Sequence, residues 1–157
     1  MSATRAPPLV LALAVAALAG ASACINEDLY LYETELRGTV SAPMGLTPDA
    51  ELHVEVHHAS FGTGATAHPL GLIETFVVEP DADGNFERSV LVPSERGEGL
   101  VVYAWLDLDG DGVLCGLDGD GQPEPAGLVE LDGFPAHELS FALALDDSCA
   151  GPEALFP

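Results

Sequence analysis

The chain has 157 residues, of which 26 are Asp or Glu and only 4 are Lys or Arg, so its formal net charge is −22 at pH 7. We expect no nucleic-acid partner, because phosphate binding needs clustered Lys and Arg. The same charge opposes adsorption to an anionic lipid surface, so attachment to a membrane would need a lipid anchor.

Residues 1–23 have the pattern of a secretory signal peptide. Arg5 is the only charge in this segment, residues 9–18 are apolar, and small residues lead up to Cys24. The apolar run is too short for a transmembrane helix. We therefore expect export and removal of this segment, which leaves a mature chain with a net charge of −23 because Arg5 is lost.

The sequence Ala21-Ser22-Ala23-Cys24 resembles the lipobox of bacterial lipoproteins, although Ala21 stands where Leu is commonest. The resemblance implies that Cys24 is lipidated and becomes the first residue of the mature protein. Ile25 is not the Asp that resembles an inner-membrane retention signal, so the outer membrane or the cell surface is the expected location. The alternative is an ordinary signal peptide that is cut near Ala23.

The mature chain divides into a tether (residues 24–33), one domain (34–147) and a C-terminal tail (148–157). Residues 29–32 are expected either to pack on the domain or to continue as an edge strand. Short β-type segments separated by Gly/Pro turn clusters follow, and no segment has a sustained helical period. The expected strands are residues 35–42, 51–58, 71–79, 86–92, 100–106, 127–131 and 138–145.

Alternation within these strands predicts a β-sandwich. Leu52, Val54 and Val56 are expected to face the core, whereas the side chains between them face outward. Residues 100–106 are apolar on both faces, as in a central covered strand. Tyr103 and Trp105 share one face there, where they either cover the sheet, the favoured interpretation, or form a carbohydrate platform.

Three segments resemble the transthyretin-like and carboxypeptidase-regulatory-like modules of bacterial lipoproteins. They are Leu36-Arg37-Gly38-Thr39-Val40, the turn Asp81-Ala82-Asp83-Gly84-Asn85-Phe86 with the strand after it, and Tyr103-Ala104-Trp105-Leu106-Asp107. The resemblance implies an all-β, single, seven-stranded antiparallel Ig-like or transthyretin-like sandwich without catalytic activity. The His and Ser positions that give transthyretin-related hydrolases their activity have no counterpart here, so we expect a protein that is not an enzyme. We also expect a monomer.

An acidic loop follows the central strand. Its carboxylates and glycines have the spacing of an EF-hand calcium loop. The predicted calcium ligands are Asp107, Asp109, Asp111, Val113 through its carbonyl oxygen, and Asp118. Asp118 stands where an EF-hand has a bidentate Glu, so the affinity should be modest. The alternative is a solvated Asp/Gly turn. The segment 118–124 could add ligands to this site or form a second one, but a solvated turn is favoured for it.

Cysteine usage predicts one disulfide. If Cys24 carries the lipid, two cysteines remain, Cys115 and Cys149. An even number of remaining cysteines in an exported protein suggests a disulfide between them. Such a bond would tie the acidic loop to the C-terminal tail. Two unpaired thiols are the alternative.

Histidines suggest a second type of metal site. His53, Glu55 and His57 share one face of the strand 51–58, and imidazole with carboxylate suits zinc or copper. However, His53 and His57 would lie about 13 Å apart, too far for one ion unless the strand is distorted or another strand supplies a ligand, so an exposed polar face is favoured.

The favoured function is a lipid-anchored envelope or cell-surface protein, a structural or binding module with a calcium loop, whose protein or glycan partner is undefined. The alternatives are a periplasmic transition-metal-handling protein that uses the strand histidines and a carbohydrate-active envelope enzyme.

Overall fold

The computed structural model describes residues 31–46, 51–59, 70–93, 99–116, 122–131 and 133–156. The predicted signal peptide, Cys24 and most of the predicted tether therefore lie outside the described residues. The elements are β1 (Leu31–Ser41), β2 (Glu51–Ala59), β3 (Leu70–Val78), β4 (Asn85–Pro93), β5 (Gly99–Asp107), β6 (Pro125–Leu131), β7 (Glu138–Ala144), β8 (Asp147–Ser148) and the short helix α2 (Pro152–Leu155). The all-β prediction is confirmed.

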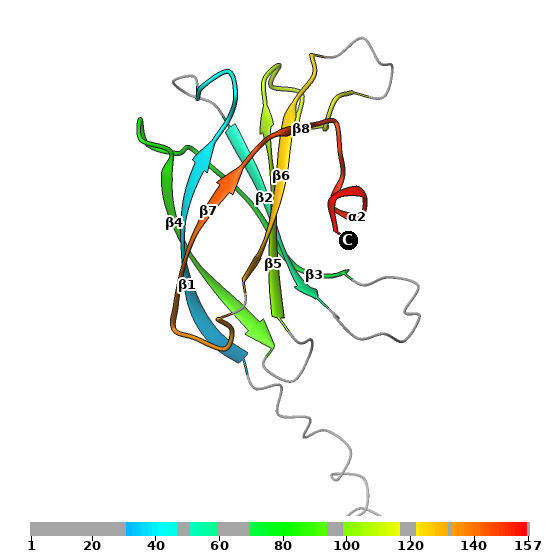
Figure 1. The fold of residues 1–157 in the computed structure, drawn as a ribbon. Coiled ribbons are helices and arrows are strands. Elements are labelled where there is room, and N and C mark those ends of the chain that lie inside the picture. Colours follow the sequence, from blue (N-terminus) through cyan, green and yellow to red (C-terminus); the bar gives the residue numbers. More distant parts are fainter. Residues whose placement is uncertain are drawn as a thin grey trace, which may run out of the picture.

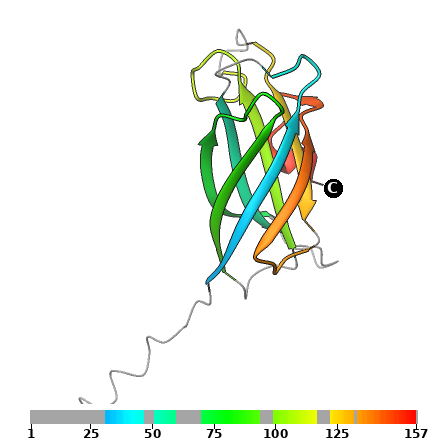
Figure 2. The same ribbon diagram turned by 90° about the vertical axis from the view of Figure 1, so that its left-hand side faces the viewer.

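The strands form two sheets that pack face to face (Figures 1 and 2). One sheet has the order β4-β1-β7 and the other has the order β3-β2-β5-β6-β8. Apolar side chains from both sheets meet in one core, with Leu36 and Val90 from the smaller sheet and Leu52, Val102 and Leu106 from the larger sheet. Because successive side chains of a strand point to opposite faces of its sheet, each strand contributes one face to this core.

The prediction of seven antiparallel strands is wrong in two respects. An eighth strand, β8, pairs with β6, and β7 runs parallel to β1, with Glu35 opposite Glu138 and Ser41 opposite Ala144. Strand direction depends on the path of the connecting chain, which local alternation does not encode. β1 also begins at Leu31, so the last residues of the predicted tether pair with β4.

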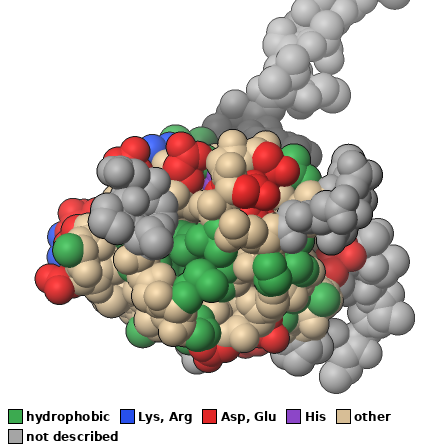
Figure 3. Space-filling view, turned by 90° about the horizontal axis from the view of Figure 1, so that it is seen from above, with side chains coloured by type: hydrophobic (Ala, Val, Ile, Leu, Met, Phe, Trp, Pro, Cys, Tyr) green, Lys and Arg blue, Asp and Glu red, His purple; other side chains and the backbone are tan. Residues whose placement is uncertain are grey.

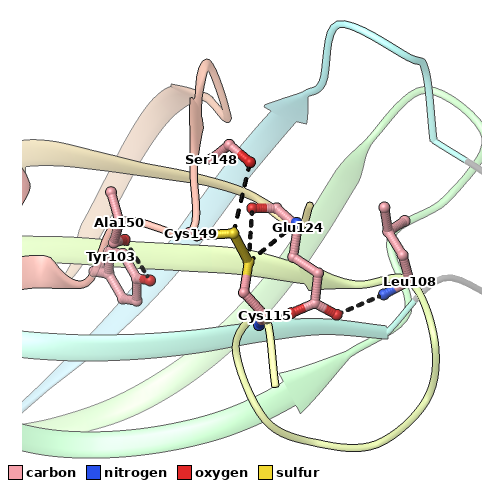
Figure 4. Close-up of a disulfide and its surroundings, with 7 residues drawn as sticks. All are labelled: Tyr103, Leu108, Cys115, Glu124, Ser148, Cys149 and Ala150. Atoms are coloured by element: carbon pink, nitrogen blue, oxygen red, sulfur yellow. Dashed lines mark hydrogen bonds between the residues drawn. A yellow bond between two sulfur atoms is a disulfide. The ribbon is translucent and has the colours of Figure 1, made fainter. Parts of the chain in front are cut away.

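β5 is buried along its whole length, as its apolar sequence predicts. One face contributes to the main core. On the other face, Tyr103, Trp105 and Ala126 form a second apolar cluster, against which Leu114 and Leu155 pack. Tyr103 also donates a hydrogen bond to the carbonyl oxygen of Ala150 at 2.9 Å, which holds the C-terminal segment over the sheet (Figure 4).

The turn predicted at residues 80–85 connects β3 to β4. Asp81 accepts hydrogen bonds from the backbone N–H groups of Asp83 and Asn85, at 2.9 and 2.8 Å. Gly84 has a φ of +84°, which favours glycine. In the described part of the chain, no helix has the length and apolar composition needed to cross a membrane.

Candidate functional site

Asp107, the last residue of β5, organises the acidic loop. Its side chain is only 1% exposed. Its carboxylate accepts hydrogen bonds from the backbone N–H groups of Gly110 at 2.6 Å and Gly112 at 2.9 Å. Both glycines have positive φ angles, 75° and 73°, which let the chain fold back over the carboxylate.

Two further carboxylates repeat this arrangement at the surface. Asp109 accepts a hydrogen bond from the N–H of Asp111 at 3.2 Å, and Asp111 accepts one from the N–H of Val113 at 2.7 Å. Such contacts are typical of Asp in turns and explain the loop shape without an ion.

Glu124 is fully buried and contacts both ends of the acidic loop. One carboxylate oxygen accepts a hydrogen bond from the N–H of Leu108 at 3.0 Å, and the other accepts one from the N–H of Cys115 at 2.6 Å (Figure 4). These two donors lie near the beginning and the end of the loop. Glu124 therefore ties both ends of the loop to the start of β6.

A disulfide lies next to this carboxylate. The sulfur atoms of Cys115 and Cys149 are 2.08 Å apart, and the N–H of Cys149 donates to the carbonyl oxygen of Glu124 at 3.0 Å. The acidic loop, Glu124 and the C-terminal segment are thus joined by one bond network (Figure 4).

The three acids Asp107, Asp109 and Glu124 form a compact cluster. One carboxylate oxygen of each lies within 4.8 Å of those of the other two. The two described arginines lie elsewhere: Arg37 pairs with Glu35 and other acids, and Arg88 pairs with Glu74. His53 lies beside the cluster, with its Nε2 atom 3.7 Å from Asp107 Oδ2.

The environment moves the pKa values of the two buried acids in opposite directions. Burial raises the pKa of Glu124, its two backbone hydrogen bonds offset only part of this effect, and nearby Asp107 and Asp109 raise it further. Burial also opposes ionisation of Asp107, but the hydrogen bonds from Gly112 and Gly110 outweigh it and lower the pKa. The cluster thus combines a stabilised carboxylate with a destabilised one.

The structure brings together only some of the predicted calcium ligands. Asp107 and Asp109 meet, whereas Asp111 is not part of the cluster of described acids. The carbonyl oxygen of Val113 accepts a hydrogen bond from Gly116 at 3.2 Å. Asp118 lies outside the described residues.

Glu124 supplies the third carboxylate, which the loop spacing does not predict. Trp105 pairs with Ala126 across β5 and β6, and extending this antiparallel register by two residues places Glu124 opposite Asp107. The available sequence signal was weak: Glu124 belongs to an Asp/Gly/Pro segment that could add ligands to the loop.

The strand histidines do not meet. His57 is buried and lies 2.9 Å from Glu55, whereas it was expected to be exposed. The reason is that its register partner, Val101, is on the second face of β5, which is also buried. His53 stacks on Trp105, with ring centroids 4.2 Å apart.

An apolar hollow lies at the same end of the molecule as the acidic loop. It has a volume of about 350 Å³, and Pro43, Met44, Pro123, Leu145 and Asp146 are among the residues that line it. Figure 3 shows apolar side chains gathered in the middle of this end with acidic ones around them.

Fold and site together define an all-β protein whose acidic loop is bonded to the C-terminal segment through a disulfide. No protein-family model and no curated protein matches the chain. A solved structure, described as an alternative pilotin from the type II secretion system of Vibrio cholerae, is similar at 14% sequence identity and a TM-score of 0.44. The match covers 76% of this chain and 99% of that chain, and at this TM-score it does not establish a shared fold.

Proposed function

We propose that this chain is an exported, lipid-anchored protein of the cell envelope, a non-catalytic structural or binding module whose acidic loop holds calcium through Asp107, Asp109 and Glu124. The observation that carries the proposal is the meeting of these three carboxylates, two of them buried, at one end of the sandwich.

The hydrogen bonding of Glu124 favours its ionised form in this arrangement. Both of its carboxylate oxygens accept a backbone hydrogen bond. A protonated carboxyl would have to turn one oxygen into a donor, and each oxygen already faces an N–H group. A cation between the three acids would relieve their mutual repulsion without disturbing these bonds.

Calcium is the cation that this ligand set suits best. All three side chains offer hard oxygen ligands, and calcium takes six to eight oxygens, of which water and carbonyl groups can supply the remainder. Sites of exported modules usually bind calcium with dissociation constants of about 0.1–1 mM. We expect an affinity in this range because only three carboxylates converge.

The disulfide supports export, and the geometry of the domain says where an anchor on Cys24 would leave the acidic loop. Disulfides persist in oxidising compartments outside the cytosol. β1 begins at Leu31, seven residues after Cys24, so the tether reaches at most about 25 Å. The N-terminal end of β1 and the acidic loop lie at opposite ends of the sandwich (Figures 1 and 2). A lipid on Cys24 would therefore leave the loop facing away from the membrane.

Thermal unfolding tests the calcium site. The mature chain, purified in detergent, is melted in EDTA and in about 10 mM calcium, a concentration about 10 to 100 times the expected dissociation constant. Calcium should then stabilise the fold by about 1.4–2.7 kcal/mol, a shift of a few degrees or more. No calcium-dependent shift in the parent protein would contradict the site.

Two matched variants make this test specific. Asp109→Asn keeps the side-chain oxygen that accepts from Asp111 but removes the charge, so most of the calcium shift should be lost. Asp83→Asn makes the same change in the exposed turn between β3 and β4 and should leave the shift intact.

Membrane fractionation tests the anchor. Cys24→Ser should release the protein from the membrane fraction, and mass spectrometry of the parent should detect acyl chains on its N-terminal Cys24. Unchanged membrane attachment of the variant would contradict lipid anchoring and would leave the calcium proposal standing.

A further inference from the structure

We propose that Glu51, His53 and Asp107 form a second metal site, suited to a transition-metal ion such as zinc, at the junction of β2 and β5. One ligand atom of each residue lies within 4.8 Å of those of the other two. This inference goes beyond the proposed calcium site, because it uses a different set of ligands and shares only Asp107 with it.

The pairing of β2 with β5 produces the group. Glu51 is opposite Asp107, and His53 is opposite Trp105. Residues two apart along a strand point to the same face, so the ligands Glu51, His53 and Asp107 lie together on the face of the sheet that carries Trp105. An imidazole with two carboxylates is a ligand set that zinc accepts, whereas calcium rarely takes nitrogen.

The environment of the His53 Nε2 atom supports the presence of a metal site. This atom is buried and has no hydrogen-bond partner among the described residues. Its distance from Asp107 Oδ2, 3.7 Å, is too long for a hydrogen bond. Two ligands of a tetrahedral zinc ion, each about 2.0–2.1 Å from the metal, lie about 3.3 Å apart. The observed separation therefore needs only a small adjustment to place one ion between the two atoms.

Neighbouring groups hold two of the ligands in position. The His53 ring stacks on Trp105 at a centroid distance of 4.2 Å and an interplanar angle of 18°. The Asp107 carboxylate is oriented by the N–H groups of Gly110 and Gly112. Such supporting contacts are typical of metal ligands. A surface hollow of about 340 Å³, lined in part by His53, Trp105 and Gly112, gives an ion access from solvent.

Zinc titration of the mature chain in detergent tests the proposal, with a chromogenic zinc chelator as competitor. We expect one zinc ion per chain with a dissociation constant of about 1 μM or tighter, and a tetrahedral visible absorption spectrum when cobalt replaces zinc. Binding weaker than about 100 μM, or the absence of the cobalt spectrum, would overturn the site and leave His53 as a side chain that packs on Trp105.

Substitutions at histidines decide whether His53 is the ligand. His53→Phe keeps an aromatic ring stacked on Trp105 but removes the nitrogen, so zinc affinity should fall at least tenfold while far-UV circular dichroism is unchanged. His137→Ala changes an exposed histidine before β7, in the other sheet, and should bind zinc like the parent. Parent-like zinc binding by His53→Phe would overturn the assignment.

The calcium proposal and the zinc proposal can be tested independently of each other. His53→Phe should keep the calcium-dependent thermal shift, whereas Asp109→Asn should keep zinc binding. Zinc binding without a calcium shift would contradict only the proposed function, and a calcium shift without zinc binding would contradict only this inference. Asp107→Asn should weaken both, because its carboxylate serves both groups.

Discussion

The Glu124 carboxylate accepts a 2.6 Å hydrogen bond from the N–H of Cys115, and the disulfide partner of Cys115, Cys149, donates its own N–H to the Glu124 carbonyl oxygen at 3.0 Å. The buried residue Glu124 thus forms hydrogen bonds with both cysteines that the disulfide joins. The covalent bond and the hydrogen bonds restrain the same end of the acidic loop, so their contributions to stability should not be additive.

Removal of the Glu124 side chain should destabilise the fold. Glu124→Ala leaves the partly buried N–H groups of Leu108 and Cys115 without their acceptor. Each such loss costs about 1–3 kcal/mol, so we expect the free energy of unfolding in EDTA to fall by about 2–6 kcal/mol. Urea denaturation measures the change. Glu130→Ala, an exposed acid on β6, is the control and should change the value by less than about 0.5 kcal/mol.

Loss of the disulfide should have a comparable cost. The bond joins residues 34 positions apart, and in the chain-entropy model a loop of this length contributes about 3–4 kcal/mol by restricting the unfolded chain. The double variant Cys115→Ser/Cys149→Ser should therefore unfold at lower urea concentration than the oxidised parent. Reductant should lower the stability of the parent but not that of the variant, and equal midpoints for the oxidised parent and the variant would contradict the prediction.

Stability in EDTA should depend on pH through Glu124. Its pKa in the folded protein is raised above the ordinary value of 4.5, chiefly by burial, so the folded state holds this proton more tightly than the unfolded state. The contribution of Glu124 to the free energy of unfolding therefore decreases as the pH rises above about 4.5. The melting temperature should decline over this range more steeply in the parent than in Glu124→Gln, which has no proton to lose. Calcium should reduce the decline, because a cation favours the carboxylate.

Asp107 should act in the opposite direction at lower pH. Burial alone would raise its pKa, but the hydrogen bonds from Gly112 and Gly110 hold the pKa below the ordinary value of 3.8. Its ionised form therefore stabilises the fold above pH 3.8, and this contribution is lost as the pH falls through the folded-state pKa. Melting between pH 2 and 5 should show a smaller acid-dependent loss for Asp107→Asn than for the parent, and equal losses would contradict this.

Two glycines with positive φ should respond differently to alanine. Gly110, with a φ of +75°, has open space where a Cβ would stand, so Gly110→Ala should cost only about 1–2 kcal/mol for backbone strain. At Gly84, with a φ of +84°, a Cβ would also clash with the carbonyl oxygen of Val40. Gly84→Ala should therefore cost more than Gly110→Ala, by at least about 1 kcal/mol in urea denaturation. Equal costs would show that β1 can move away from the turn.

Most strand positions follow from the sequence because the determining signals are local. Alternation at Leu52, Val54 and Val56 locates β2, and the apolar run of β5 predicts burial on both faces. The turn before β4 follows from Asp81 and Gly84. These signals need no knowledge of partners, since each reflects the side-chain period of one strand or the backbone preference of one residue.

The candidate sites were less predictable. The loop spacing identifies Asp107 and Asp109 as neighbours, but it points to Asp118 rather than Glu124 as the closing acid. It also gives no reason to associate Glu51 and His53 with Asp107. Both groupings arise from strand register, which places residues from distant positions side by side only after the chain has folded.

The sequence by itself determined that this protein is all-β, strongly acidic and built around a buried strand that ends in an acidic loop. Only the tertiary structure decided that β7 runs parallel to β1, that Glu124 lies beneath the loop and that His53 faces Asp107. The physical reason is that composition and periodicity act along the chain, whereas strand direction and register depend on how separate segments bury their apolar faces against one another.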